Sequence, residues 1–185
     1  MNDFIKKLFS LFRKKEENPP KIKVCWDFLA LILSQFYLTD DEIAEFSEIM
    51  DDHNPEHLLA VIREYVVPYY NSLSPKNQEK IKNTLTYYLN TNSKKLERVF
   101  PSRHIPLDET IAKLFYTLVW KELYGTNFPE PINPDDYKED WSTQYAMSLY
   151  GLDNVTEEHR SVYKEPSFAN LMARLKQIQA EKSDS

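Results

Sequence analysis

Apolar residues recur through most of the chain at spacings of three and four, the pattern of helices that bury one face. Five segments show it clearly, at about residues 40–50, 55–69, 75–89, 109–124 and 167–182. Their stripes include Ile43, Phe46, Ile49 and Met50; Leu58, Ile62, Val66 and Tyr69; Ile81, Leu85, Tyr88 and Leu89; and Phe168, Leu171, Met172, Leu175 and Ile178. We therefore expect an all-α fold, a compact irregular bundle of about seven helices preceded by a short amphipathic N-terminal helix.

Residues that favour helix ends agree with this pattern. Those that favour a helix N-terminus are Thr39 (with Glu42 three residues on), Asn54, Ser74, Asp108 and Asn133, of which the two asparagines and Ser74 precede a proline. Gly125 and Gly151 stand where a helix requires a left-handed residue after its last turn. Pro68 is expected to kink or end the helix that begins after Asn54.

Two further helices are expected. The apolar run VCWDFLALILSQFY, residues 24–37, predicts a central helix buried on all sides, with Asp27 as its exception. After Asn133, a spacing of four between aromatic or aliphatic residues predicts a helix that Gly151 ends. Its inward residues are Tyr137, Trp141, Tyr145 and Leu149.

Composition narrows the fold class. The 185 residues are enough for one domain with a substantial core, and we divide the chain into a basic amphipathic helix (1–15), a proline-containing linker (16–22) and one helical domain (23–185). Because the chain has two glycines, β-sheets and phosphate-binding loops are not expected. The one cysteine, Cys25, cannot form an internal disulfide and lies in an apolar run, which indicates a buried thiol.

The N-terminal stretch FIKKLFSLFRKK combines an apolar and a basic helix face. The apolar face carries Phe4, Ile5, Leu8, Phe9, Leu11 and Phe12, and the basic face carries Lys6, Lys7, Arg13 and Lys14. Residues 1–15 have a net charge of +4, which leaves −10 for the remainder of a chain of net charge −6. This composition is typical of helices that lie on a membrane surface.

Three surfaces suit that amphipathic face: an anionic membrane, the body of the same protein, and a partner protein. The Pro-Pro pair at residues 19–20 favours a segment held away from the body. The segment lacks the long apolar core of a secretion signal, and the longest uncharged apolar stretch of the chain, 28–38, is shorter than the ~20 residues of a membrane-spanning helix. We expect a cytoplasmic protein that can also associate peripherally with the inner face of a membrane.

Charge is unevenly distributed in the body. Between Asp40 and Ile62 there are eight acidic residues and no lysine or arginine, whereas residues 76–103 carry a net charge of +5. Each run is commonly a solvated helix face, but an acidic face also suits docking of a basic protein. The candidate partner-binding residues are Asp40, Asp41, Glu45, Glu48, Asp51 and Asp52. The overall negative charge disfavours nucleic acid as a partner.

Candidate chemistry is sparse. The stretch DDHNPEH places His53 and His57 four apart, but Asn54-Pro55 starts a helix between them, so the two imidazoles are not on one helix face. We expect no metal site and no cofactor. The function favoured is a non-enzymatic interaction protein, for example an immunity or inhibitor protein for a basic toxin. The alternative is an enzyme with a site assembled across helices around His53, His57 or His104.

Overall fold

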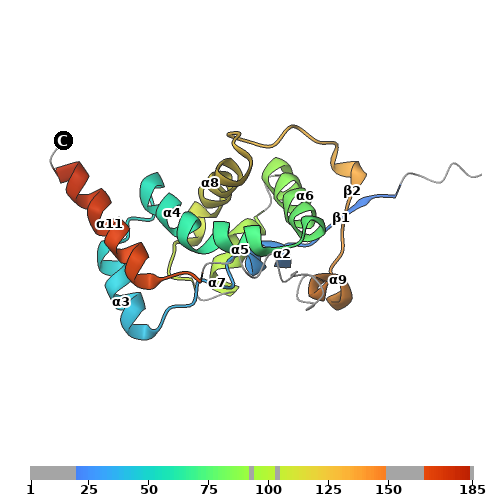
Figure 1. The fold of residues 1–185 in the computed structure, drawn as a ribbon. Coiled ribbons are helices and arrows are strands. Elements are labelled where there is room, and N and C mark those ends of the chain that lie inside the picture. The colour runs from blue at the N-terminus through green and yellow to red at the C-terminus, as the bar shows by residue number, and fades with distance from the viewer. Residues whose placement is uncertain (1–19, 92–93, 103–104, 149–164, 184–185) are drawn as a thin grey trace, which may run out of the picture.

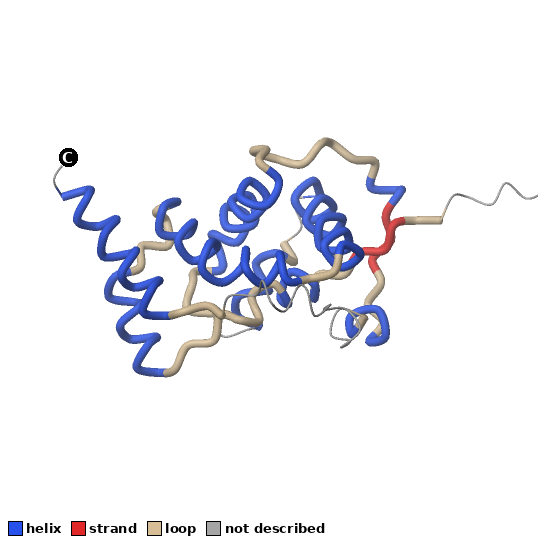
Figure 2. The backbone as a smooth tube through the Cα atoms, in the orientation of Figure 1, coloured by secondary structure: helices blue, strands red, loops and turns tan. Residues whose placement is uncertain are grey.

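The computed structural model describes residues 20–91, 94–102, 105–148 and 165–183. Helices make up most of this part of the chain (Figures 1 and 2), which confirms the all-α prediction. The predicted N-terminal helix and residues His104, Leu149 and Gly151 lie outside the described residues. The five striped segments correspond to α3 (Asp40–Ile49), α4 (Pro55–Val61) with its continuation, α6 (Pro75–Thr91), α8 (Ala112–Tyr124) and α11 (Phe168–Ser183).

Several capping residues occupy the predicted places. The Thr39 hydroxyl accepts a hydrogen bond from the Glu42 backbone N–H at 3.4 Å, and the Glu42 carboxylate accepts one from the Thr39 N–H at 2.8 Å. The Asn54 side chain caps α4, and the Asp108 side chain caps a 3-10 turn (Glu109–Ile111) that leads into α8. Gly125 ends α8 with φ of 72°, the left-handed conformation for which glycine is suited.

Pro68 was expected to kink or end the helix that begins after Asn54, and it does not end that helix. The chain continues from α4 through a π-helical turn (Ile62–Val66) into α5 (Val67–Ser72). The N–H of Val67 reaches back five residues to the carbonyl of Ile62. A proline cannot donate a backbone hydrogen bond and its ring crowds the carbonyl four residues earlier, so the wider turn before Pro68 accommodates the ring while the helix continues.

The prediction of one buried helix over residues 24–37 is wrong in secondary structure, and its burial is confirmed for the middle of the run but not for Tyr37, which is exposed. This run instead forms the end of strand β1 (Ile22–Val24), the short helix α2 (Asp27–Leu31) and hydrogen-bonded turns over residues 32–36. Its residues from Phe28 to Leu33 are nevertheless all buried. An apolar run buried on all sides has no periodicity that distinguishes helix from strand or turn.

The helix predicted after Asn133 is also wrong. Residues Pro134–Asp136 form a 3-10 turn, Tyr137–Glu139 form strand β2, and a short helix α9 begins only at Thr143 and ends at Met147. Strand β2 pairs in parallel with β1, with Lys23 opposite Lys138, so the described part of the chain contains a small two-stranded sheet that the sequence did not predict. Trp141, predicted to face inward, is 49% exposed.

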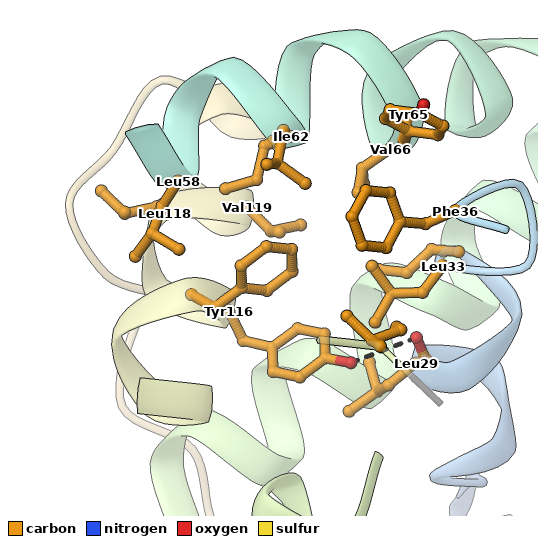
Figure 3. Packing of buried hydrophobic residues seen from close by; sticks show 14 of the residues in the cluster. Leu29, Leu33, Phe36, Leu58, Ile62, Tyr65, Val66, Tyr116, Leu118 and Val119 are labelled. Atoms are coloured by element: carbon orange, nitrogen blue, oxygen red, sulfur yellow. Dashed lines mark hydrogen bonds between the residues drawn. The ribbon is translucent and has the colours of Figure 1, made fainter. Parts of the chain in front are cut away.

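The core lies between α2, the α4–α5 helix and α8 (Figure 3). Leu29 and Leu33 come from the α2 region, Ile62 from the π-helical turn, and Tyr116 from α8. The Tyr116 hydroxyl donates a hydrogen bond to the carbonyl of Leu29 at 3.2 Å, which satisfies a polar group inside the apolar core. Helix α6 packs against α2, α8 and β1, and the short segments η2 (Leu96–Arg98) and α7 (Val99–Ser102) connect toward α8.

Helices α3 and α11 lie side by side at one end of the molecule, away from β1, β2 and α9 (Figure 1). Helix α11 packs against both α3 and α4 through the stripe predicted from the sequence. Leu171, Met172, Leu175 and Ile178 are buried there. This arrangement places α3, with its acidic residues, at the periphery of the fold.

Candidate interaction surface

Helix α3 exposes its carboxylates to solvent, because the rest of the protein covers only one side of the helix. Phe46 is fully buried against Phe36, with ring centroids 5.7 Å apart, and Ile43 and Ile49 are partly buried against the core. The opposite side is exposed along the length of the helix. The exposed acidic residues on it are Asp40, Asp41, Glu45 and Glu48.

These carboxylates differ in their contacts within the protein. Asp40, Asp41 and Glu48 form no hydrogen bond or ion pair with any described residue. By contrast, the Glu45 carboxylate lies 3.2 Å from the ammonium of Lys176 on α11, and the Glu42 carboxylate is used in the capping box. Three carboxylates on α3 are therefore unpaired with the rest of the described chain and accessible from outside. We call Asp40, Asp41 and Glu48 the acidic triad.

Tyr37, next to the acidic triad, was not singled out from the sequence. Its side chain is 84% exposed, the most exposed of the large hydrophobic residues in the described chain, and it lies three residues before Asp40. The sequence placed Tyr37 at the end of a buried helix, although the capping box at Thr39 already required the chain to leave any preceding helix by that point. An exposed aromatic beside carboxylates is a common anchor in protein interfaces.

Asp51 and Asp52, the other two predicted partner-binding residues, shape the loop between α3 and α4. The Asp51 carboxylate accepts from the backbone N–H of His53 at 3.1 Å. The half-buried Asp52 accepts from the backbone N–H of Asp108 at 3.1 Å and lies 2.7 Å from the His53 imidazole. Both carboxylates are thus occupied by contacts inside the protein, which distinguishes them from the acidic triad.

The same loop brings Asp51, Asp52 and His53 close enough to offer three ligand atoms within 4.8 Å of one another. His57 does not add a fourth ligand there, because its Nδ1 atom accepts a hydrogen bond from the Asp51 backbone N–H at 3.0 Å. His53 lies before α4, as the sequence predicted, so the two imidazoles do not share a helix face. The hydrogen bonds in which these side chains take part account for their proximity, and we assign the cluster to the structure of the loop.

Glu56, the last acidic residue of the run, belongs to a different surface. It lines a hollow of about 200 Å³ between α4, the π-helical turn and α11, together with Arg63, Glu64, Asn170 and Arg174. The Glu64 carboxylate accepts from the Ser167 backbone N–H at 2.7 Å and so fixes the segment that enters α11. With two arginines and two glutamates, the lining is balanced in charge and does not favour one class of ligand.

The basic run is partly paired. Lys80 donates to the Ser148 hydroxyl at 2.9 Å, and Lys95 forms an ion pair with Glu139 while its ammonium lies 4.2 Å from the centre of the Trp141 ring. The exposed members in the described chain are Lys76, Lys82, Lys94 and Arg98; Arg103 lies outside the described residues. The basic side chains are therefore spread over α6 and the segment after it and are interrupted by internal contacts.

Cys25 is buried, at 1% exposure, and its thiol lies 3.6 Å from the Asp27 carboxylate. Burial raises the pKa of the Cys25 thiol to about 11, and the negative charge of Asp27 also opposes ionisation. Asp27, the exception in the apolar run, is thus half-buried beside the thiol. A thiol in this environment is a poor nucleophile.

Comparison of the chain with known protein families, with curated proteins and with solved structures gave no match. None of the helices in the described part of the chain is long and apolar enough to cross a lipid bilayer. The predicted membrane-surface residues in 4–14 lie outside the described residues.

Proposed function

We propose that this protein is a non-enzymatic interaction protein that docks a basic partner protein on α3, and that residues 4–15 hold it on the inner face of an anionic membrane. The observation that carries the docking proposal is the acidic triad of Asp40, Asp41 and Glu48 beside the exposed Tyr37. Unpaired carboxylates attract a basic surface and speed encounter, and a neighbouring aromatic side chain supplies buried contact area once the partner is seated.

An immunity or inhibitor protein for a basic toxin is the specific form of this proposal. Such a protein needs a rigid acidic surface that covers a positively charged active site. Helix α3 meets this need, since it is fixed by a capping box at its start and by Phe46 in the core, and its free carboxylates all lie on the uncovered side. Charge complementarity contributes speed and specificity more than it contributes affinity.

The docking proposal is tested by first finding the partner at the α3 surface. A photo-crosslinking amino acid at Tyr37 in the full chain identifies the contacting protein in cells, and the affinity of the purified partner is then measured. Reversal of Asp40, Asp41 and Glu48 to lysine is expected to weaken binding at least about tenfold, as is Tyr37→Ala. The matched control reverses Glu97, Glu130 and Asp135, which are exposed and lie on other parts of the surface.

The comparison between the two triple variants distinguishes binding at the α3 surface from an effect of the net charge of the protein. Both change the charge of the protein by the same amount, so an equal loss of affinity in both would mean that only net charge matters. Unchanged affinity in the α3 variant and in Tyr37→Ala would place the interface elsewhere and overturn the proposal. Circular dichroism confirms that each variant retains its helix content.

The membrane proposal rests on the segregation of the basic and apolar residues in FIKKLFSLFRKK. Each basic side chain near an anionic leaflet contributes about 1 kcal/mol, and apolar burial adds to this. Reversal of Lys6, Lys7, Arg13 and Lys14 to glutamate is expected to abolish co-sedimentation with phosphatidylglycerol-containing vesicles. The control reverses Lys76, Lys82, Lys94 and Arg98 and should still bind. Binding that survives the first reversal, or absence of binding by the unaltered chain, would contradict the proposal.

A further inference from the structure

His57 lies where the end of α3, the first turn of α4 and the second half of α11 come together. Its side chain is only 2% exposed, and its Nδ1 atom accepts a hydrogen bond from the backbone N–H of Asp51 at 3.0 Å. Asp51 follows directly after Met50, the residue that caps the C-terminus of α3. The imidazole therefore ties the end of α3 to the beginning of α4.

This hydrogen bond defines the protonation state of His57. Because the Asp51 N–H is a donor, Nδ1 must carry a lone pair, and the neutral ring has its proton on Nε2. The Nε2 atom is buried and forms no hydrogen bond with any residue that the structure describes. Burial lowers the pKa of His57, the positive charge of Lys182 on α11 lowers it further, and the negative charge of Asp51 opposes both effects.

The other element that packs against α4 contributes no charge at this position. Helix α8 packs against α4 and the π-helical turn largely through apolar side chains, with Leu118 and Val119 beside Leu58 and Ile62 (Figure 3), and the Glu122 carboxylate of α8, which pairs with Arg63, is not among the charges that act on His57. The charged groups that act on His57 are therefore Asp51 from the loop and Lys182 from α11. A proton on the imidazole would bring its charge into this apolar surrounding next to Lys182, which is unfavourable.

Helices α3 and α11 are linked to each other by their own contacts. The Gln179 side chain donates to the carbonyl of Ile49 at 2.9 Å, and Lys176 pairs with Glu45 at 3.2 Å. The two helices lie together at one end of the molecule (Figures 1 and 2), where α11 packs against α4 and α3 is joined to the core through Phe46 against Phe36. Opening of this pair uncovers Phe46 and the inward stripe of α11, and such a peripheral unit opens at a lower free energy than the core.

We propose that His57 is a proton-sensitive latch, and that its protonation releases α3 and α11 from α4 while the rest of the protein stays folded. A proton from solvent adds to the lone pair of Nδ1, after which the ring N–H and the Asp51 N–H are two donors facing each other. The hydrogen bond is lost, and repulsion from Lys182 favours separation of α11. The latch does not depend on the partner proposed above. If that partner binds α3, protonation of His57 would also move the surface that the partner contacts.

The direction of the pH dependence follows from the lowered pKa. The ordinary pKa of histidine is 6.5, and in the folded protein that of His57 lies below it. The stabilisation from the latch is therefore fully present above pH 6.5 and is lost as the pH falls through the lower pKa of the folded state. Opening of α3 and α11 should increase over that range.

Hydrogen exchange of the full chain, followed by mass spectrometry at pH 7.5 and pH 5.0, tests this directly. After correction for the intrinsic pH dependence of exchange, we expect protection of peptides from α3 and α11 to fall at least about tenfold at pH 5.0, while peptides from α8 keep theirs. His57→Asn should remove this difference, because an asparagine oxygen can accept the Asp51 N–H and does not titrate. The control His53→Asn, at an exposed histidine paired with Asp52, should retain it.

Two results would overturn the proposal: an equal loss of protection in α8, which indicates global unfolding, or the same pH effect in His57→Asn. If His57→Asn does not fold, NMR of the unaltered protein decides. The imidazole nitrogens of His57 and the amide of Asp51 should then shift with one common midpoint below pH 6.5. A midpoint at or above 6.5, or an Asp51 amide that does not follow the imidazole, would rule the latch out.

Discussion

Arg63 and Glu122 form a two-pronged ion pair that joins the π-helical turn to α8. The guanidinium Nε and one terminal nitrogen donate to the two carboxylate oxygens of Glu122 at 2.8 and 3.0 Å. The carboxylate of the next residue, Glu64, accepts a hydrogen bond from the backbone N–H of Ser167 and so holds the entry to α11. The π-helical turn before Pro68 thus presents two successive charged residues to two different helices.

The ion pair should make a small and salt-sensitive contribution to stability. The carboxylate raises the pKa of the Arg63 guanidinium, but the Arg63 side chain is 53% exposed, so water screens the interaction. A double-mutant cycle with Arg63→Met and Glu122→Gln, measured by urea unfolding, is expected to give a coupling free energy of about 0.5–1 kcal/mol that diminishes at high salt. A coupling above about 2 kcal/mol, or one insensitive to salt, would contradict this.

Local chemistry in the sequence predicted the longer helices because their signals lie within a few residues of one another. The capping box of Thr39 and Glu42, the Asn54 and Asp108 caps and the left-handed Gly125 all act within a single turn. The inward stripe of α11 can likewise be identified from its helical spacing alone, without knowledge of the helices that it packs against. These features were confirmed.

The small sheet could not be predicted because its pairing is long-range. Strand β1 ends at Val24, and its partner β2 begins at Tyr137, so neither strand is specified without the other. In the folded protein Val24 is buried and β1 packs on α6, so the beginning of the apolar run 24–37 is a strand and not the predicted helix. The spacing of Tyr137, Trp141 and Tyr145 was compatible with a helix, but local periodicity carries no information about a distant strand.

For the candidate interaction surface, the sequence identified the acidic run and the capping role of Glu42, but not the long-range contacts of the other acidic residues. Glu42 is used in a cap and Glu45 pairs with Lys176, which lies 131 residues away in the chain. Only the folded arrangement distinguishes the paired Glu45 from the unpaired Asp40 and Asp41. The exposure of Tyr37 depends on where the chain turns after α2; the capping box at Thr39 indicates that a preceding helix must end there, but not that the Tyr37 side chain faces outward.

Cys25 should resist thiol reagents until the protein unfolds. With the pKa of the thiol at about 11, about one molecule in a thousand carries a thiolate at pH 8, and the sulfur is covered by the core. We expect reaction with a disulfide reagent at pH 8 to be at least about a hundredfold slower than for the same chain in guanidinium chloride. Labelling as fast in the native as in the unfolded protein would show that the β1–α2 region is open.

The same shift adds a pH dependence at alkaline pH. The folded-state pKa of Cys25 is raised above its usual value of 9, so the associated stabilisation is present below pH 9 and is lost as the pH rises toward 11. In Cys25→Ala this component should be absent, which the urea midpoint at successive pH values would reveal. Tyrosines with raised pKa values, such as Tyr65, remain in both proteins and provide the common background.

Thr84 offers a test of the polar groups buried along α6. Its side chain is fully buried, and within the described part of the chain its hydroxyl has no hydrogen-bond partner. Because an unpaired buried hydroxyl loses its hydration without compensation, Thr84→Val, which keeps the shape, is expected to stabilise the protein by about 1 kcal/mol. Thr84→Ser keeps the hydroxyl but removes a buried methyl group and should destabilise by about 1 kcal/mol. Destabilisation by the valine variant in urea unfolding would instead indicate that an ordered water pairs with the hydroxyl, in which case a crystal structure should show that water between α6 and its neighbours.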